Sequence, residues 1–172
     1  MLANDLDERG WAIVPRVLGR DDCERLRAMY ANDAVFRSRV VMQRHGFGQG
    51  EYQYFGYPLL ERVAQLRATL YPRLVAVANR WHERMGLATR FPSTHAEFLA
   101  RCHGAGQTRP TPLLLRYRAG DYNCLHQDVY GEHVFPLQAV VLLSRPGIEF
   151  DGGELVLTEQ RPRMQSRASV LP

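Results

Sequence analysis

The chain has 172 residues and is 45% hydrophobic, which predicts a single domain with a real core. No apolar run is long enough to span a membrane, and the polar N-terminal stretch MLANDLDERG does not have a signal-peptide pattern, so we expect a cytoplasmic protein without a membrane partner. The three cysteines fit a reducing compartment, and the net charge of +4, carried by arginine without lysine, does not by itself indicate a nucleic-acid-binding protein.

Residues 1–111 are predicted to be mainly helical. In the stretch 19–33, Asp21 or Asp22 can cap a helix that continues with an apolar stripe. Pro72 can begin a new first turn, so we expect two helices on either side of it. In chain order, the predicted elements are a strand at 10–18, a helix at 19–33, a strand at 38–43, a glycine-rich hairpin or structured loop at 44–58, helices at 59–70 and 72–85, and a helix with a Ser/Thr cap at 93–103.

Residues 112–172 have a different pattern, in which apolar, strand-like runs alternate with turns containing glycine, proline or aspartate. The runs are 113–120, 123–131, 133–144 and 154–160, and the final residues ASVLP are typical of another strand. A β-rich part behind a helical part defines an α+β protein. The sequence contains no internal repeat or linker, so both parts are expected to belong to one domain.

The motif His126-Gln127-Asp128 lies in one of these predicted strands. Residues i and i+2 of a strand point to the same face, so an imidazole and a carboxylate are expected side by side. They are two of the three ligands of a 2-His-1-carboxylate triad, which holds Fe(II) and leaves positions open for substrate and O₂. The motif alone is a weak signal, because a surface His/Asp pair arises easily by chance.

The surroundings of the motif resemble a known family of enzymes. The stretches LLLRYRAGDYNCLHQDVYGEHVFPLQ and GGELVLTEQRPRMQSR contain, in order, a tyrosine, a glycine turn, H-x-D, an apolar strand and a Gly-Gly-Glu turn. This order is similar to that of iron- and 2-oxoglutarate-dependent dioxygenases with a double-stranded β-helix, in particular the prolyl-hydroxylase-like members. The amino-acid sequence of these two stretches resembles one bacterial subfamily more closely still. Its members are described as oxygenases acting on damaged, methylated DNA, and some are labelled prolyl hydroxylases.

The resemblance implies a fold and an extent. N-terminal helices would pack on a double-stranded β-helix, the cupin-like jelly roll, within a single oxygenase domain over residues 1–172. The mainly helical part would be 1–111, and 112–172 would form the first half of the β-helix. The family's third metal ligand, a histidine, and the arginine that anchors 2-oxoglutarate would lie beyond Pro172. We therefore expect a C-terminally truncated β-helix and an inactive fragment.

The resemblance also implies a site. His126 and Asp128 correspond to the first two iron ligands. Tyr117 corresponds to a tyrosine that can hydrogen-bond a carboxylate of 2-oxoglutarate, although a core tyrosine is an equal alternative, and Tyr122 flanks the pocket. Fe(II) would be the metal, with 2-oxoglutarate and O₂ as co-substrates.

The implied activity is hydroxylation of a substrate C–H bond, and the first interpretation is oxidative demethylation of damaged DNA. A prolyl hydroxylase, or another protein or amino-acid hydroxylase, is the alternative among enzymes. A non-catalytic β-helix binding module with a vestigial His/Asp pair is the alternative from another class. The expected partner is accordingly damaged or methylated nucleic acid, or a protein or amino-acid substrate.

Several other residues are weaker candidates for the functional site. His133 follows a turn at an odd spacing and is expected at the rim rather than on the metal. Cys124 is expected to pack beside the pair, and Cys102-His103 lacks the second pair that a zinc site needs. The stretch 37–55 interleaves arginines with aromatic residues, which can hold phosphates and stack bases. It can equally form a hairpin whose aromatic side chains cover the mouth of the β-helix.

Overall fold

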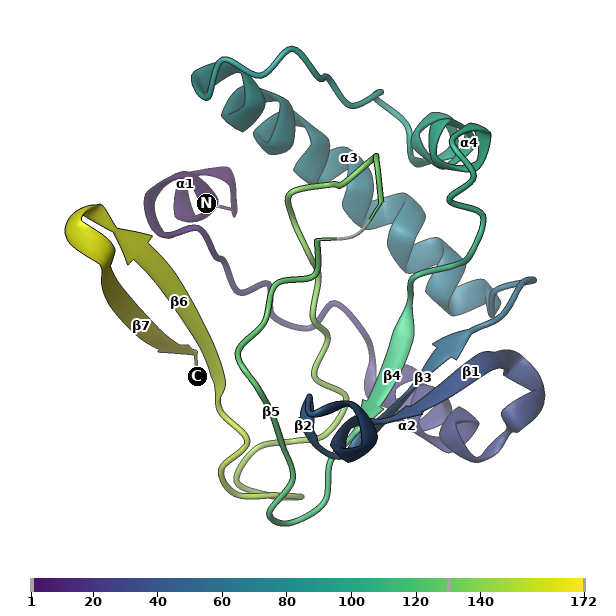
Figure 1. The fold of residues 1–172 in the computed structure, drawn as a ribbon. Coiled ribbons are helices and arrows are strands. Elements are labelled where there is room, and N and C mark those ends of the chain that lie inside the picture. Colours follow the sequence, from purple (N-terminus) through teal and green to yellow (C-terminus); the bar gives the residue numbers. More distant parts are fainter. Residues whose placement is uncertain (1, 130, 172) are drawn as a thin grey trace. The chain divides into compact units, whose positions relative to one another are not determined.

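A computed structural model describes residues 2–129 and 131–171, in two units, Met1–Val141 and Leu142–Pro172 (Figure 1). The α-helices of the first unit are α1 (Leu2–Arg9), α2 (Arg20–Ala28), α3 (Glu61–Arg84) and α4 (His95–Gly104). Its short 3₁₀ helices are η1 (Met29–Ala31), η2 (Asp33–Val35) and η3 (Met42–His45). Its strands are β1 (Phe36–Val41), β2 (Gly48–Gln49), β3 (Glu51–Phe55), β4 (Leu113–Arg116) and β5 (Tyr122–Asn123). The second unit contains β6 (Leu155–Arg161), η4 (Pro162–Met164) and β7 (Gln165–Leu171).

The strands of the first unit form two antiparallel sheets. The larger sheet has the order β1-β3-β4, with Gln53 of the central strand opposite Arg39. One of its faces packs on the segment after α2, where the buried Gln53 amide donates to the backbone carbonyl of Tyr30 at 2.8 Å. The smaller sheet pairs Gly48 of β2 with Asn123 of β5. This pairing connects the glycine-rich hairpin, which is confirmed, to the segment that carries the H-x-D motif.

The second unit is an antiparallel hairpin. Its ladder runs from the pair Leu155 and Leu171 to the pair Arg161 and Gln165 next to η4. The strands predicted from residues 154–160 and from the final ASVLP run are therefore confirmed. Together with the sheets of the first unit, they give a mixed protein of helices and antiparallel strands.

The described strands do not close into a barrel, and the jelly roll implied by the resemblance is not formed in residues 2–129 and 131–171. The predicted strands at 10–18 and 133–144 are wrong, and among the described residues of the run 123–131, which are 123–129 and 131, only Asn123 belongs to a strand. A strand depends on ladder hydrogen bonds to a neighbour, and in a jelly roll many neighbours come from distant parts of the chain. The run 133–144 thus has the composition of a strand without a described strand beside it.

One long helix occupies the region where two were predicted. Helix α3 continues through Pro72 for 24 residues, although proline lacks the N–H that a helical bond requires. Tyr71 and Val75, on either side of the proline, are buried, and the Tyr71 hydroxyl donates to the carbonyl of Pro92 at 2.7 Å. Packing of this face therefore outweighs the preference of proline for a helix start. Neither α3 nor any other helix in the described ranges is long and apolar enough to cross a membrane.

Helices α2 and α4 lie where the sequence predicts helices, but their N-termini are capped differently. In α4, Thr94 Oγ1 accepts from the N–H of Glu97 at 3.2 Å and the Glu97 carboxylate accepts from the N–H of Thr94 at 3.3 Å, which is a capping box. In α2 the N-cap is Gly19, without a side-chain bond, so the predicted cap is wrong. Asp21 and Asp22 lie inside the first turn, where they favour the helix through its dipole.

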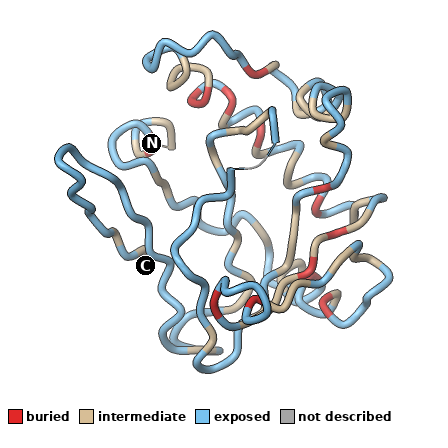
Figure 2. The backbone as a smooth tube through the Cα atoms, viewed as in Figure 1, coloured by how far each residue is buried: buried red, intermediate tan, exposed pale blue. Residues whose placement is uncertain are grey.

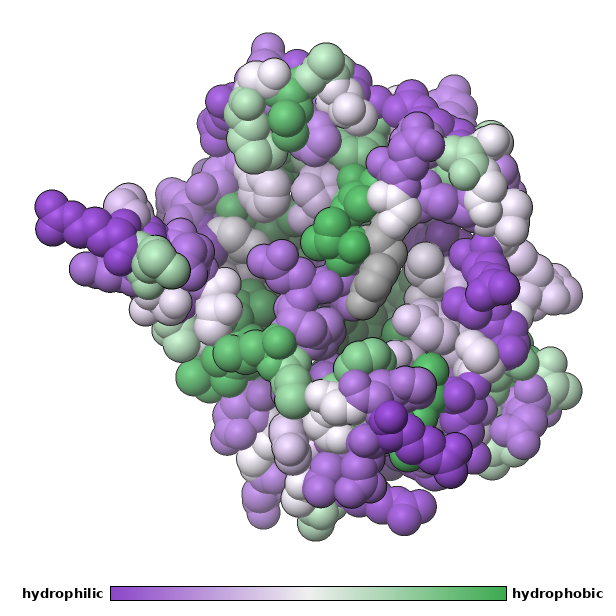
Figure 3. Space-filling view, viewed as in Figure 1, coloured by the Kyte–Doolittle hydropathy of each residue, from purple (hydrophilic) through white to green (hydrophobic). Residues whose placement is uncertain are grey.

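The core lies in the first unit, along α3 and in the larger sheet with its adjoining turns, shown in red in Figure 2. Beyond Pro110, none of the residues described is buried. Large hydrophobic side chains are exposed there instead, and hydrophobic residues form separate groups on the face seen in Figure 3. The main cluster consists of Tyr71, Val75, Ala78 and Phe91, with Phe98, Phe135 and Leu137 packed against it.

Asp7 attaches α1 to α3 and provides a test of this packing. Its Oδ1 accepts from the indole N–H of Trp81 at 2.7 Å, and its Oδ2 accepts from Arg80 at 2.7 Å. The hydrogen bond from Trp81 and the Arg80 guanidinium hold the pKa of Asp7 below its usual value. Asp7→Asn is expected to lower the melting temperature near neutral pH and to change the fluorescence of Trp81, because the charged acceptor is lost.

The effect of Asp7→Asn should depend on pH in a defined direction. A carboxylate with a lowered folded pKa stabilises the fold above its unfolded value, here 3.8, and this contribution is lost as the pH falls through the folded value. The melting temperatures of the two proteins should therefore converge in acid. Asp5→Asn is the matched control, because Asp5 pairs with Arg9 inside α1 at 2.8 Å. Equal effects of the two substitutions would contradict the role of Asp7 between helices.

Candidate metal centre

His126 and Asp128 direct potential metal-binding atoms toward each other. The distance from His126 Nε2 to Asp128 Oδ1 is 3.7 Å, and the two side chains are 49% and 46% exposed. This separation is too long for a hydrogen bond. An ion roughly 2.1 Å from each atom would span it. The geometry is therefore compatible with two positions of a metal centre.

The other polar atoms of the pair are already held. His126 Nδ1 lies 2.8 Å from the carbonyl oxygen of Cys124, and since a carbonyl can only accept, Nδ1 carries the proton. In the tautomer that carries its proton on Nδ1, Nε2 has a lone pair for a metal. The side-chain amide of Gln138 donates to Asp128 Oδ2 at 2.9 Å, which leaves Oδ1 available. Histidine and carboxylate ligands of metals are typically oriented by partners of this kind.

The pair converges without the strand that was predicted for it. Strand β5 ends at Asn123, and both His126 and Asp128 lie in the irregular segment that follows. The prediction that they lie in a strand is therefore wrong for the described residues. The two side chains nevertheless lie together, and the hydrogen bond to the Cys124 carbonyl sets the orientation of the imidazole ring.

A third protein ligand does not join the pair in the described part of the chain. Across residues 2–129 and 131–171, no three His, Cys, Asp or Glu side chains are grouped so that they could hold a metal ion. His133 lines a cavity of about 470 Å³ together with Phe91 and Phe98. The thiol of Cys124 is directed at the carbonyl of Gly46, with an S···O distance of 3.8 Å.

Tyr117 lies one residue beyond β4 and packs on the backbone of the hairpin. Gly50 has a φ of 122°, and a Cβ there would lie 3.0 Å from Tyr117 Cδ1, so the close approach of the ring requires glycine. Burial raises the pKa of Tyr117, and a side-chain hydrogen bond with Asn123 lowers it by less. The phenol is therefore protonated near neutral pH and can donate a hydrogen bond.

Tyr122 is held by the smaller sheet. It lies in β5 opposite Gln49 of β2, and its side chain is 56% exposed. Tyr122 belongs to β5, and Tyr117 bonds Asn123 of the same strand. Strand β5 directly precedes the segment that carries His126 and Asp128. The structure therefore places the tyrosines predicted for co-substrate binding at the start of this segment, with the His/Asp pair after it.

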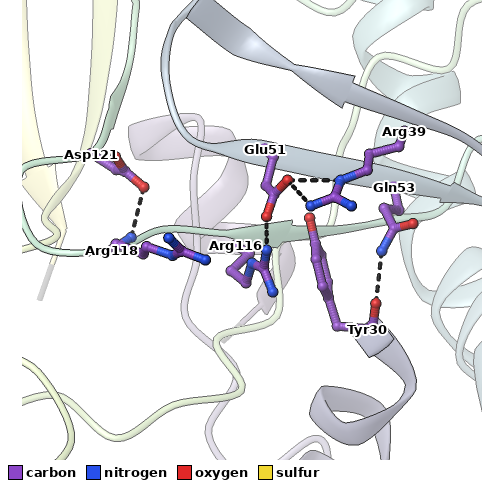
Figure 4. A network of polar contacts seen from close by, with 7 residues as sticks. All are labelled: Tyr30, Arg39, Glu51, Gln53, Arg116, Arg118 and Asp121. Carbon is purple, nitrogen blue, oxygen red and sulfur yellow. Dashed lines mark hydrogen bonds and ion pairs between the residues drawn. The ribbon is translucent and has the colours of Figure 1, made fainter. Parts of the chain in front are cut away.

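An ion-pair network fixes the end of β4 that presents Tyr117 (Figure 4). The carboxylate of Glu51 accepts from Arg39 Nε at 2.7 Å and pairs with Arg116, which is opposite it in the sheet. The guanidinium of Arg116 also lies over the ring of Tyr30, 4.5 Å from its centroid. Because Arg116 directly precedes Tyr117, this network fixes the point at which the chain leaves β4 and Tyr117 begins.

The sequence pattern did not identify these supporting residues. Gln138 and Asn123 act only through contacts with segments that are brought together by folding. A cross-strand pair of opposite charges, such as Glu51 and Arg116, is the one signal that could have been sought, once the two strands were paired.

Residues 50–172 match a family of oxygenases, described as catalysing oxidative methylation of damaged DNA. The chain belongs to this family, which is named Oxygenase-NA. Two curated proteins of Mycobacterium tuberculosis, one from strain CDC 1551 / Oshkosh and one from strain ATCC 25618 / H37Rv, both named as uncharacterized, are each 47% identical to it over 150 residues. The match covers 84% of the chain and 64% of each relative. No solved structure matches the chain significantly.

Proposed function

We propose that the protein is an Fe(II)- and 2-oxoglutarate-dependent dioxygenase that oxidises a methyl group on a damaged DNA base. The observation that carries the proposal is the convergence of His126 Nε2 and Asp128 Oδ1 at 3.7 Å, with the remaining polar atom of each residue held by a partner. Imidazole and carboxylate are the donors typical of non-haem Fe(II) oxygenases. The description of the family supports the reaction class and damaged DNA as the substrate.

Each residue of the site has a defined task in this proposal. His126 and Asp128 would hold the metal, oriented by the Cys124 carbonyl and the Gln138 amide. The protonated phenol of Tyr117 would donate a hydrogen bond to a carboxylate of 2-oxoglutarate. With O₂, the bound metal supplies the oxidation, in which 2-oxoglutarate becomes succinate and CO₂ and one oxygen atom enters the substrate C–H bond.

The third ligand is proposed to come from outside the 172 residues. The described residues bring two donors together, and a facial triad needs three. The relatives are longer, since the match spans 64% of their length. We propose that the third ligand and the group that anchors 2-oxoglutarate correspond to part of the relatives' length that the match does not cover, and a longer form is one that includes this part.

The test is turnover by the two forms. The longer form, with Fe(II), O₂, 2-oxoglutarate and N-methylated single-stranded DNA, is expected to form succinate and an equal amount of formaldehyde, because an N-hydroxymethyl group breaks down to formaldehyde and the N–H. The 172-residue chain is expected to be inactive or nearly so. Succinate is measured by NMR and formaldehyde by chemical trapping.

Three outcomes would contradict parts of the proposal. Succinate formation with a hydroxylated proline peptide, and no formaldehyde from DNA, would favour a protein hydroxylase. Robust turnover by the 172-residue chain would show that it contains a third ligand, with His133 and His103 the first residues to re-examine. No turnover by either form, with DNA binding intact, would favour a binding module.

A further inference from the structure

Arg44, His45 and Phe47 form a basic–aromatic platform in η3 and just before β2. All three side chains are exposed, Phe47 by 45%. The rings of His45 and Phe47 are stacked, with centroids 5.3 Å apart and an interplanar angle of 24°. Arg44 makes no ion pair with any residue that the structure describes. An exposed aromatic pair that follows an exposed arginine in the chain has the chemistry to stack a nucleobase and to contact a phosphate.

The platform is hydrogen-bonded to the segment that carries the candidate metal ligands. The carbonyl of Phe47 accepts from the N–H of Cys124 at 2.8 Å. The carbonyl of the same Cys124 holds the imidazole of His126, also at 2.8 Å. The residue after Phe47, Gly48 of β2, pairs with Asn123 of β5. The platform and the metal pair are thus connected through a single residue.

The backbone of the platform is held in place from both ends. Met42, at the start of η3, is fully buried, and its carbonyl accepts from the N–H of Phe47 at 3.1 Å. Its own N–H donates to Gly50 at 3.0 Å. Gly48 has a φ of 122°, and a Cβ there would collide with the carbonyl of Tyr122. A platform with a fixed backbone loses little conformational entropy when a ligand binds.

We propose that the platform binds an unstacked base of single-stranded nucleic acid and so brings the strand to the metal pair. The inference rests on the proposed function and adds the form of the substrate, because a base inside a duplex cannot reach a reacting centre without leaving its stack. The rings of Phe47 and His45 offer a flat surface that accepts any base. Arg44, on a chain of net charge +4, supplies the positive charge that a phosphate backbone requires and a neutral peptide does not.

The test is binding of a single-stranded oligodeoxynucleotide that contains 2-aminopurine to the metal-free protein in EDTA. Phe47→Ala is expected to weaken binding by about tenfold to a hundredfold, the range for loss of one base–aromatic stack, and to remove the quenching of the fluorescent base. Phe47→Trp is expected to restore both. Arg44→Ala should reduce the steepness of the plot of log affinity against log salt concentration. The expected reduction is about 0.7, the value for one phosphate contact on a single strand.

Tyr57→Ala is the matched control. Tyr57 is 47% exposed and also contacts a histidine ring, that of His103, at 6.0 Å and 82°. It is not part of the platform, so its variant should bind DNA like the wild type. Equal affinity of Phe47→Ala and wild type, or equal losses in Phe47→Ala and Tyr57→Ala, would overturn the proposal. Tighter binding of the duplex, or of a proline-containing peptide in place of the strand, would overturn it as well.

The measurement separates this inference from the dioxygenase proposal, because it needs neither metal nor turnover. Binding that depends on Phe47, without succinate formation by the longer form, would support the platform and contradict the dioxygenase. Formaldehyde release that is unchanged in Phe47→Ala would support the dioxygenase and contradict the platform. Circular dichroism of Phe47→Ala should match that of the wild type, since the side chain is exposed.

Discussion

Replacing His126 with alanine is expected to reduce 2-oxoglutarate turnover by the longer form to background. The substitution removes one of the two donors that the structure brings together, and a carboxylate alone holds Fe(II) weakly. Asp128→Ala should have the same effect, because it removes the other donor. Metal binding is measured separately by anaerobic titration with Fe(II), so that loss of the metal can be distinguished from loss of chemistry.

Two variants calibrate this prediction. Gln138→Ala leaves both donors in place and removes only the hydrogen bond to Asp128, so it should weaken metal affinity by about 10- to 100-fold without abolishing turnover. His133→Ala removes a histidine seven positions further along the chain, which lines a cavity with Phe91 and Phe98, and it should retain turnover. Full metal affinity in His126→Ala would show that the pair is not the metal site. Loss of turnover in His133→Ala alone would place a ligand there instead.

Elements with local determinants could be predicted from the sequence. Helix α4 is defined by Thr94 and Glu97, which lie within one turn of each other. The strand beginning near residue 154 pairs with the next strand along the chain, so no distant partner is needed. The run 133–144 is different, because its apolar composition shows only that it can be buried. Whether it becomes a strand depends on partners that a linear pattern does not reveal.

The same distinction applies to the candidate site. The predicted proximity of the His126 and Asp128 side chains is found, but the strand from which it was predicted is not, because an irregular backbone holds them. Gln138 bonds Asp128 from a segment that packs on the main cluster through Phe135 and Leu137. Neither hydrophobic periodicity nor motif spacing indicates such a contact. The metal itself stays a prediction.

Phe91→Ala is expected to lower the free energy of unfolding by about 3–5 kcal/mol, the usual cost of removing a core phenylalanine. Phe91 is 5% exposed, and its ring lies 5.0 Å from that of Phe135 and 5.6 Å from that of Phe98. Its backbone is held independently, because its N–H donates to Asn79 Oδ1 at 2.7 Å. The variant therefore tests packing alone, and the melting temperature should fall by about 10 °C.

The cluster around Phe91 also links stability to the site, and Phe135→Ala separates the two effects. Phe135 is half-buried against Tyr71 and Phe91, with ring centroids 5.2 and 5.0 Å away, and it lies three residues before Gln138. Its loss should cost about 2 kcal/mol, less than Phe91→Ala, because less apolar surface is buried. It should nevertheless weaken metal affinity in the same direction as Gln138→Ala, since the segment loses one of its two contacts with the cluster and keeps Leu137. Phe47→Ala, at an exposed phenylalanine, should change neither unfolding nor metal affinity. A metal affinity unaffected by Phe135→Ala, measured below the unfolding transition, would show that Gln138 is held by other contacts.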